Sequence, residues 1–165
     1  MKLSHLVAPV LAVSLFGAAP TFAQTTPAAP AADAAASASN AGATPLPGDA
    51  VYKAFHGEEG IQRIMDDFIV RITTDPRIKD RFANANLVRL KLLLVQQVSY
   101  LTGGPQTYSG RDMKTAHEGM GLKNGDFNAL AEDLQLSMDK EGVPFRAQNK
   151  LLAKLAPMEH QIVPH

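Results

Sequence analysis

Apolar side chains recur every three or four residues through most of the chain after residue 48, and this spacing places them on one face of an α-helix. No segment alternates apolar and polar residues for long enough to predict a β-strand. The pattern therefore predicts an all-α fold. The expected helices cover 58–74, 76–82, 87–101, a brief stretch around 113–117, 124–141 and a last one from 144 onward.

Capping and turn residues separate these helices. Asp75-Pro76 ends the first one, because proline restricts the residue before it and cannot continue a helix. Asn86 is a residue type that caps a helix start, and Gly103-Gly104-Pro105 ends the helix that Asn86 begins. The brief stretch around 113–117 has few apolar neighbours in sequence, so we expect something other than side chains to help fill the interior there.

The first 23 residues have the pattern of a signal peptide. Lys2 is followed by an apolar run over 6–19, and Thr21-Phe22-Ala23 ends in the small residues that signal peptidase selects. The sequence predicts cleavage after Ala23 and a periplasmic or secreted protein. The alternative is an uncleaved membrane anchor, but the run is shorter than the ~20 residues that span a bilayer.

Residues 24–48 are nearly all alanine, threonine, serine, proline and asparagine. A segment with so little apolar surface cannot offset the entropy lost on folding, so it is expected to be a disordered linker. The folded domain is expected over 49–163. Its composition is that of one globular domain, since the whole chain is 45% hydrophobic and 19% charged.

Several classes of function are excluded by composition. The formal net charge is zero, which does not favour nucleic acid as a partner. The chain has no cysteine, so it has no disulfide, thiolate nucleophile or cysteine-ligated metal. The histidines are not at chelating spacing, and no phosphate loop, dinucleotide fingerprint or Gly-x-Ser-x-Gly motif occurs.

His117 is the candidate metal ligand. It lies in the brief helical stretch bounded by Gly119 and Gly121, and Met113 lies four residues earlier on the same face. A lone histidine in a helical domain is more often structural or exposed, so the residue alone leaves both interpretations open. No Cys-x-x-Cys-His occurs, so any haem would not be attached through cysteines.

Spaced motifs over 52–163 resemble those of the truncated haemoglobins of group I. Their order and spacing agree together, most specifically around His117. The motifs are Phe55-His56-Gly57-Glu58-Glu59-Gly60-Ile61, Asp66-Asp67-Phe68, Arg71, Asp75-Pro76, Arg81-Phe82, Leu87-Val88-Arg89-Leu90-Lys91, Gly103-Gly104-Pro105, Tyr108-Ser109-Gly110-Arg111-Asp112-Met113, His117-Glu118-Gly119-Met120-Gly121-Leu122, Gly142-Val143-Pro144 and Leu155-Ala156-Pro157.

The resemblance implies a two-over-two helical sandwich around haem b, with His117 as the proximal iron ligand. It also implies that Phe82 packs on the haem face, although Phe82 could equally be an ordinary core residue. Basic residues at the haem rim of this family meet the propionates. The candidates here are Arg89, Lys91, Arg111 and Lys114, with Lys91 the first choice, and the alternative for each is a solvated charge.

The distal side departs from the family pattern. The resemblance puts tyrosine where this chain has Ile69, and glutamine where it has Leu94. Both polar groups normally donate hydrogen bonds to bound dioxygen. An apolar distal wall of Phe68, Ile69, Leu90, Leu94 and Val98 is therefore expected, with fast dioxygen release and relatively good binding of carbon monoxide and nitric oxide.

Polar residues near this wall leave one alternative open. Gln96, Gln97 or Tyr100 could turn into the distal side and supply the missing donor. Gln97 has the most favourable position, one turn beyond Leu93.

The expected function is reversible binding of diatomic gases outside the cytoplasm, with a reductant in the same compartment as a partner. Carriage, scavenging and sensing all fit this description. A haem enzyme, such as a nitric oxide dioxygenase or a peroxidase, is the first alternative. The lost tyrosine position and the missing distal acid–base group weaken it. A haem-free helical interaction domain is the second alternative. No nucleic acid and no stable membrane span after cleavage are expected.

Overall fold

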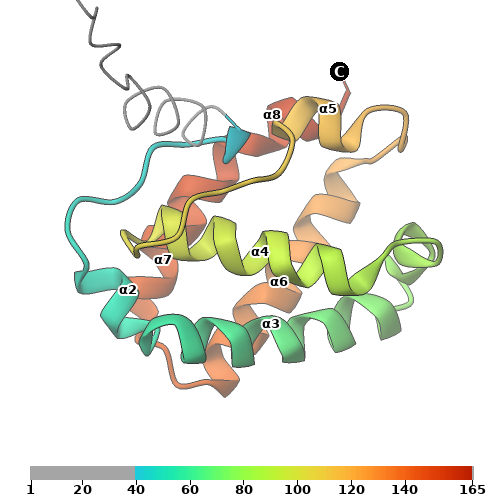
Figure 1. Ribbon diagram of the computed structural model, residues 1–165. Helices are drawn as coiled ribbons and strands as arrows, with labels where there is room; N and C mark the ends of the chain where they lie inside the picture. The colour runs from blue at the N-terminus through green and yellow to red at the C-terminus, as the bar shows by residue number, and fades with distance from the viewer. Residues whose placement is uncertain (1–39, 165) are drawn as a thin grey trace, which may run out of the picture.

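The computed structural model describes residues 40–164. The expected signal peptide and residues 24–39 of the expected linker lie outside this range. Within it, the structure is helical and contains no strand, as the sequence predicted (Figure 1). The helices are α2 (Ala50–Ala54), α3 (Gly57–Thr74), η1 (Lys79–Phe82), α4 (Leu87–Leu101), α5 (Met113–His117), α6 (Asn124–Lys140), α7 (Phe145–Leu155), η2 (Ala156–Met158) and α8 (Glu159–Ile162).

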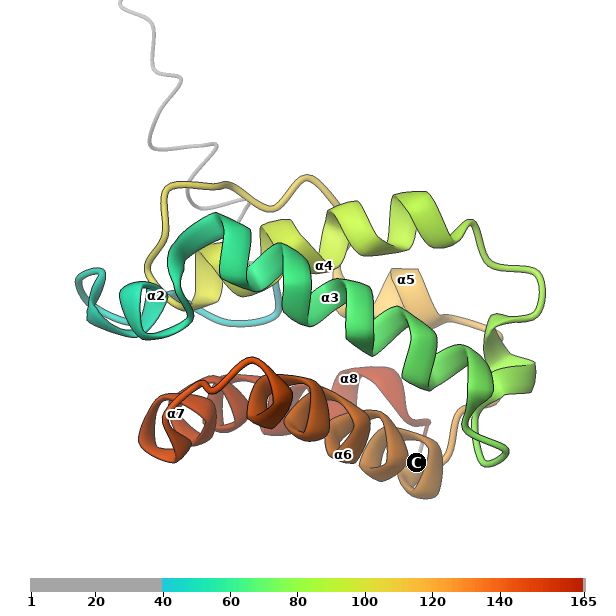
Figure 2. The same ribbon diagram turned by 90° about the horizontal axis from the view of Figure 1, so that it is seen from below.

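Two pairs of helices form two layers. Figure 2 shows α3 beside α4 in one layer and α6 beside α7 in the other. Across the layers α3 contacts α6, and α4 contacts α7. The short helices α5 and α8 pack together near one end of this arrangement (Figure 1). The layering is the two-over-two sandwich that the resemblance implied.

The core lies between these layers. On α3 the residues spaced by three and four are the buried ones, and they include Ile61, Ile64, Phe68 and Ile72. Their partners on the other helices include Val98, Leu101, Leu134, Met138 and Leu151. Among the described residues, no helix combines the length and the apolar character needed to cross a membrane.

The linker expected over 24–48 includes residues that the structure places against the helices. Residues 40–48 are not a loose tether but pack against the helices. Ala41 is fully buried, and the amide of Leu46 donates to the carbonyl of Leu101 at 2.9 Å. The backbone of Gly48 lies against Gly103, where a Cβ would be 1.9 Å from the Gly48 carbonyl oxygen. Only glycine permits this close approach.

Candidate functional site

His117 ends a helix that is held by local bonds at both ends. The Asp112 carboxylate caps α5 by accepting the amide of Thr115 at 2.9 Å. After α5 the chain turns through Gly119 and Gly121, which both have positive φ. A helix of five residues has little stability of its own, so its position depends on its neighbours.

The imidazole of His117 has a defined orientation. Its Nδ1 atom lies 2.8 Å from the carbonyl oxygen of Met113. A carbonyl oxygen only accepts, so Nδ1 carries the hydrogen, and the neutral ring presents its lone pair at Nε2. Nε2 has no hydrogen-bond partner within residues 40–164, and the side chain is half-buried. A histidine held through one nitrogen with the other available is arranged as a metal ligand.

The apolar residues predicted for the distal side lie on α3 and α4. Ile69, Leu90 and Leu94 are half-buried and pack against the core, as does Phe82 of η1. Phe68 is covered by other side chains and is only 2% exposed, as Met113 is at 4%. The half-buried residues thus retain surface for a bound group, whereas Phe68 and Met113 are covered by other side chains.

Two apolar residues of α6, which were not among the predicted site residues, share this incomplete burial. Phe127 and Leu130 are half-buried, although Leu134 and Met138 on the same helical face are buried. The same change occurs along α4, where Leu90 and Leu94 are less buried than Val98 and Leu101. The apolar spacing of α6 indicates which residues face the interior. It does not indicate which part of that face is left uncovered by the other helices.

The two glutamines that could have entered the distal side are held elsewhere. The side-chain amide of Gln97 donates to the carbonyl oxygen of Ala41 at 3.0 Å and lies 3.4 Å from the sulfur of Met113. The Gln96 side chain accepts from the amide of Ser109 at 3.2 Å and from its hydroxyl at 2.7 Å. Tyr100 is half-buried, and burial raises the pKa of its hydroxyl.

The expected cationic residues are not equivalent. The ammonium group of Lys91 pairs with the Asp66 carboxylate on α3, so in this arrangement it already has an acidic partner. Arg89, Arg111 and Lys114 are exposed. A role of any of these four cations at a haem propionate stays a prediction.

Arg81 provides a contact that the sequence did not predict. Its guanidinium donates to the carbonyl oxygen of Met120 at 3.1 Å and pairs with the Asp126 carboxylate at 3.0 Å. Arg81 precedes Phe82 on η1, whereas Met120 lies in the loop that follows His117. This pair of contacts joins the two segments at one edge of the site. The residues are far apart in sequence, so no local signal predicts the pairing.

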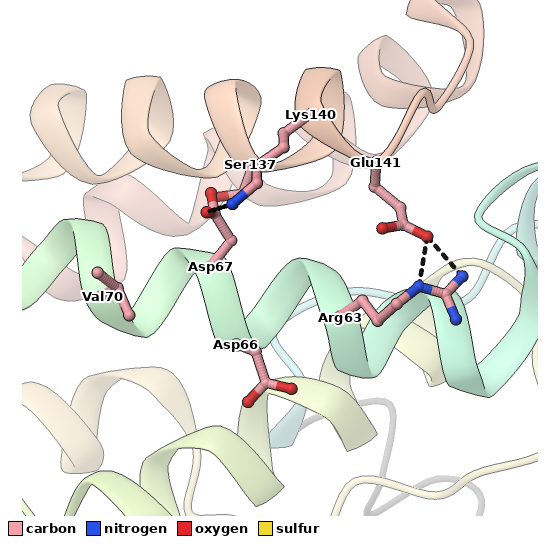
Figure 3. Close-up of a pocket in the computed structure, with 7 residues that line it drawn as sticks. All are labelled: Arg63, Asp66, Asp67, Val70, Ser137, Lys140 and Glu141. Carbon is pink, nitrogen blue, oxygen red and sulfur yellow. Dashed lines mark hydrogen bonds and ion pairs between the residues drawn. The ribbon is translucent and has the colours of Figure 1, made fainter.

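A separate pocket of about 480 Å³ opens between α3 and α6 (Figure 3). Its charges are paired within the protein: Arg63 binds Glu141 with an Nε–Oε1 distance of 2.7 Å, and Lys140 binds Asp67. Asp67 also accepts from the Ser137 hydroxyl at 3.0 Å. This pocket contains none of the predicted site residues, and its ion pairs connect the two helical layers.

The side chains predicted for the site have the chemistry that a haem needs. Within residues 40–164, no group of three or more histidine or acidic side chains is placed to hold a metal ion. One imidazole can serve a metal whose other positions are filled by a porphyrin, and this is the proximal arrangement of haem iron. The half-buried apolar residues Ile69, Phe82, Leu90 and Leu94 suit the faces of such a ring.

Comparison with known proteins agrees with this geometry. Residues 50–163 match the family model described as bacterial-like globin. A group 1 truncated haemoglobin of Mycolicibacterium paratuberculosis is 30% identical over 112 residues, which are 68% of this chain and 82% of the relative. A group 1 truncated haemoglobin of Synechocystis is 33% identical over 98 residues, covering 57% of this chain and 79% of the relative.

Solved structures show the same fold. The truncated haemoglobin of Tetrahymena pyriformis in its Fe(III) form has a TM-score of 0.67 and 25% identity, over 70% of this chain and 98% of that one. The haemoglobin of Chloroflexus aurantiacus has a TM-score of 0.61 and 24% identity, over 70% of this chain and 98% of that one. The chain therefore belongs to the bacterial-like globins and is a truncated haemoglobin of group I.

Proposed function

We propose that this haem globin favours carbon monoxide and nitric oxide over long retention of dioxygen, and that it works outside the cytoplasm. The observation that carries the proposal is the contrast between the two sides of the site. The proximal side has one oriented imidazole, and the distal positions on α3 and α4 have only hydrocarbon side chains.

When bound, haem b supplies an iron at which a diatomic gas binds opposite a histidine. His117 is suited to be that histidine, because the hydrogen on Nδ1 is directed to the Met113 carbonyl and Nε2 is left with its lone pair. Ile69, Leu90 and Leu94 contain no atom that can ligate iron. A second protein ligand to the iron would therefore not come from these three residues.

The choice among gases follows from charge. Dioxygen draws electron density from iron, and a nearby hydrogen-bond donor stabilises that charge; carbon monoxide and nitric oxide need the donor less. One such bond to a charged acceptor contributes about 1–3 kcal/mol. Ile69 and Leu94 have no donor, and Gln96 and Gln97 are bonded to Ser109 and Ala41. We therefore expect dioxygen to leave quickly.

The test uses purified protein reconstituted with haem. An absorption spectrum of the reduced protein, with and without carbon monoxide, should show a haem Soret band that moves when the gas binds. Stopped-flow mixing then gives the dioxygen dissociation rate. A slow rate in the unmodified protein would contradict the proposed preference. A colourless protein that takes up no haemin would support the haem-free alternative instead.

A matched pair of variants on α4 tests the distal assignment. Leu94→Gln returns a donor to the distal side and should slow dioxygen release by about tenfold. Leu92→Gln makes the same change at a side chain that is 53% exposed and should leave the rate unaltered. Equal effects of the two substitutions would show that Leu94 does not face the bound gas.

Export is a separate part of the proposal and rests on the sequence of residues 1–23. Expression of the full chain in a Gram-negative host should yield periplasmic protein whose mass corresponds to a start at Gln24. Recovery of the uncut chain in the membrane fraction would favour the anchor. Reduction of the iron would then require a donor in that compartment.

A haem enzyme remains the competing function. Peroxidase chemistry needs a distal acid–base group, and Ile69, Leu90 and Leu94 offer none. Nitric oxide dioxygenation needs dioxygen held long enough to react. Slow consumption of nitric oxide by the dioxygen-exposed, reduced protein is expected; rapid turnover would favour the enzyme.

A further inference from the structure

We propose that residues 40–46, named here the strap, hold the proximal helix α5 and thereby orient His117 toward the haem. This inference rests on His117 being the haem ligand. It extends the site to a segment that lies before the family match, which begins at residue 50.

The strap packs against the helices, although it lies before the residues that match the family model. Ala41 is fully buried. The side-chain amide of Asn40 donates to the carbonyl oxygen of Gly110 at 3.2 Å, in the loop that leads into α5. At its other end, the amide of Leu46 donates to the carbonyl oxygen of Leu101 at 2.9 Å. The strap is therefore fixed to α4 and to the proximal loop.

Met113 is the residue on which the strap acts. Gly42 lies so close that an added Cβ would be 3.0 Å from Cγ of Met113 and 2.8 Å from Sδ of Met158. Gln97 connects the same groups, because its amide donates to the Ala41 carbonyl at 3.0 Å and lies 3.4 Å from Sδ of Met113. Met113 is consequently only 4% exposed.

The position of Met113 decides the orientation of the ligand. Its carbonyl oxygen accepts the hydrogen of His117 Nδ1 at 2.8 Å, so a shift of Met113 turns or releases the imidazole. The helix α5 has only five residues and depends on tertiary contacts. Those contacts come from α8 and from the strap (Figure 1). Gly42 and Gln97 are thus positioning residues for His117.

Gly42 in the strap and Gly48, two residues after its end, allow a matched test. Gly42 and Gly48 both have positive φ, at 84° and 67°, so alanine is disfavoured at both by the backbone alone. An added Cβ at Gly48 meets no atom within 4 Å, whereas at Gly42 it meets Met113 and Met158. Gly42→Ala therefore perturbs the proximal side, and Gly48→Ala controls for backbone strain. Gln97→Leu removes the bond to Ala41 at similar size.

The readouts report on the iron–histidine bond and not on overall folding. Resonance Raman spectra of the reduced protein give the iron–histidine stretching frequency, and transfer of haemin to excess apomyoglobin gives the rate of haem loss. We expect Gly42→Ala and Gln97→Leu to shift or broaden the stretching band and to raise haem loss by about tenfold. Gly48→Ala should match the unmodified protein in both measurements.

The outcomes separate this inference from the proposed function. If the unmodified protein binds haem but Gly42→Ala and Gly48→Ala give the same stretching band and the same haem loss, the strap has no role in positioning. If Gln97→Leu also leaves the band unchanged, the inference is wrong and the globin assignment stands. The unmodified protein should show an iron–histidine band, and His117→Ala should remove it. If it shows no such band, or if the band persists in His117→Ala, the haem ligand itself is misassigned.

Discussion

Asp67 connects the two helical layers through one carboxylate. It accepts from Arg71 Nε at 2.6 Å and from Ser137 Oγ at 3.0 Å, and it pairs with Lys140 on α6. Burial raises the pKa of Asp67, but hydrogen bonds from Lys140, Arg71 and Ser137 outweigh it and lower the pKa to about 2. Arg71 lies four residues after Asp67 on the same helix, whereas Ser137 and Lys140 are 70 and 73 positions away, so no local signal indicates these two partners.

The free energy of unfolding should therefore decrease in acid, because Asp67 becomes protonated and loses its interactions. Its pKa is lowered on folding from 3.8 to about 2, so its contribution is complete above about pH 4 and is lost as the pH falls toward 2. The contribution is at most about 2 kcal/mol. Urea unfolding between about pH 6 and pH 2 should show a flatter pH dependence of the unfolding free energy for Asp67→Asn than for the unmodified protein.

Asp66→Asn is the control for this change. The Asp66 side chain is 63% exposed in its pair with Lys91, and such surface pairs contribute little. The pH dependence of the unfolding free energy of Asp66→Asn should follow that of the unmodified protein. Identical acid profiles for Asp66→Asn and Asp67→Asn would contradict the role assigned to Asp67.

Substitution of His117 tests its assignment as the iron ligand. His117→Ala removes the imidazole whose Nε2 is left available, so the Soret band should disappear or shift markedly. Free imidazole added to the variant should restore part of the original spectrum. His56→Ala changes an exposed histidine and should leave the spectrum unaltered. A normal spectrum in His117→Ala would require another ligand.

The long helices could be predicted closely because their apolar spacing is a local signal. The stretch expected over 87–101 is α4, and the one expected over 58–74 is α3 with one more residue at its start. The strap could not be predicted, because its composition is that of a linker and its order comes from contacts with Met113, Met158 and Gln97. The same limit applies to Arg81, whose acidic partner is 45 positions away.

Loss of the Arg81 contacts should loosen the segment that follows α5. Arg81→Ala removes the donor to the Met120 carbonyl and the pair with Asp126, so hydrogen exchange at 118–122 should speed up, and haem loss with it. Arg77→Ala is the matched control, because Arg77 pairs with Asp75 and Glu132 and not with this loop. Equal exchange rates in the two variants would argue against this role of Arg81.

Across the whole molecule, burial is uneven. The apolar faces of α4 and α6 are covered in their C-terminal halves and only half-covered at Leu90, Leu94, Phe127 and Leu130. The short helix that carries His117 could be predicted from the sequence because its motif is contiguous, and the role of His117 as iron ligand stays a prediction. The extent of the incomplete burial on α4 and α6 could not be predicted, because it depends on how far four helices overlap in space.

Haem should stabilise the whole domain by covering this surface. A ligand that binds only the folded state raises the unfolding temperature, so the protein with haem should melt several degrees higher than the haem-free protein in thermal circular dichroism. The increase should be smaller in His117→Ala, which keeps the apolar contacts but loses the iron bond. Equal melting temperatures with and without haem would indicate that these residues do not contact it.

The contact between Gly42 and Met158 joins residues that are made at very different times. During synthesis, Gly42 is made early and Met158 is made only after almost all of the remaining chain. The proximal side of the cofactor site can therefore be completed only when the polypeptide is finished. With the strap in the role proposed for it, haem is expected to be bound firmly only after the last residues of each new chain have been added.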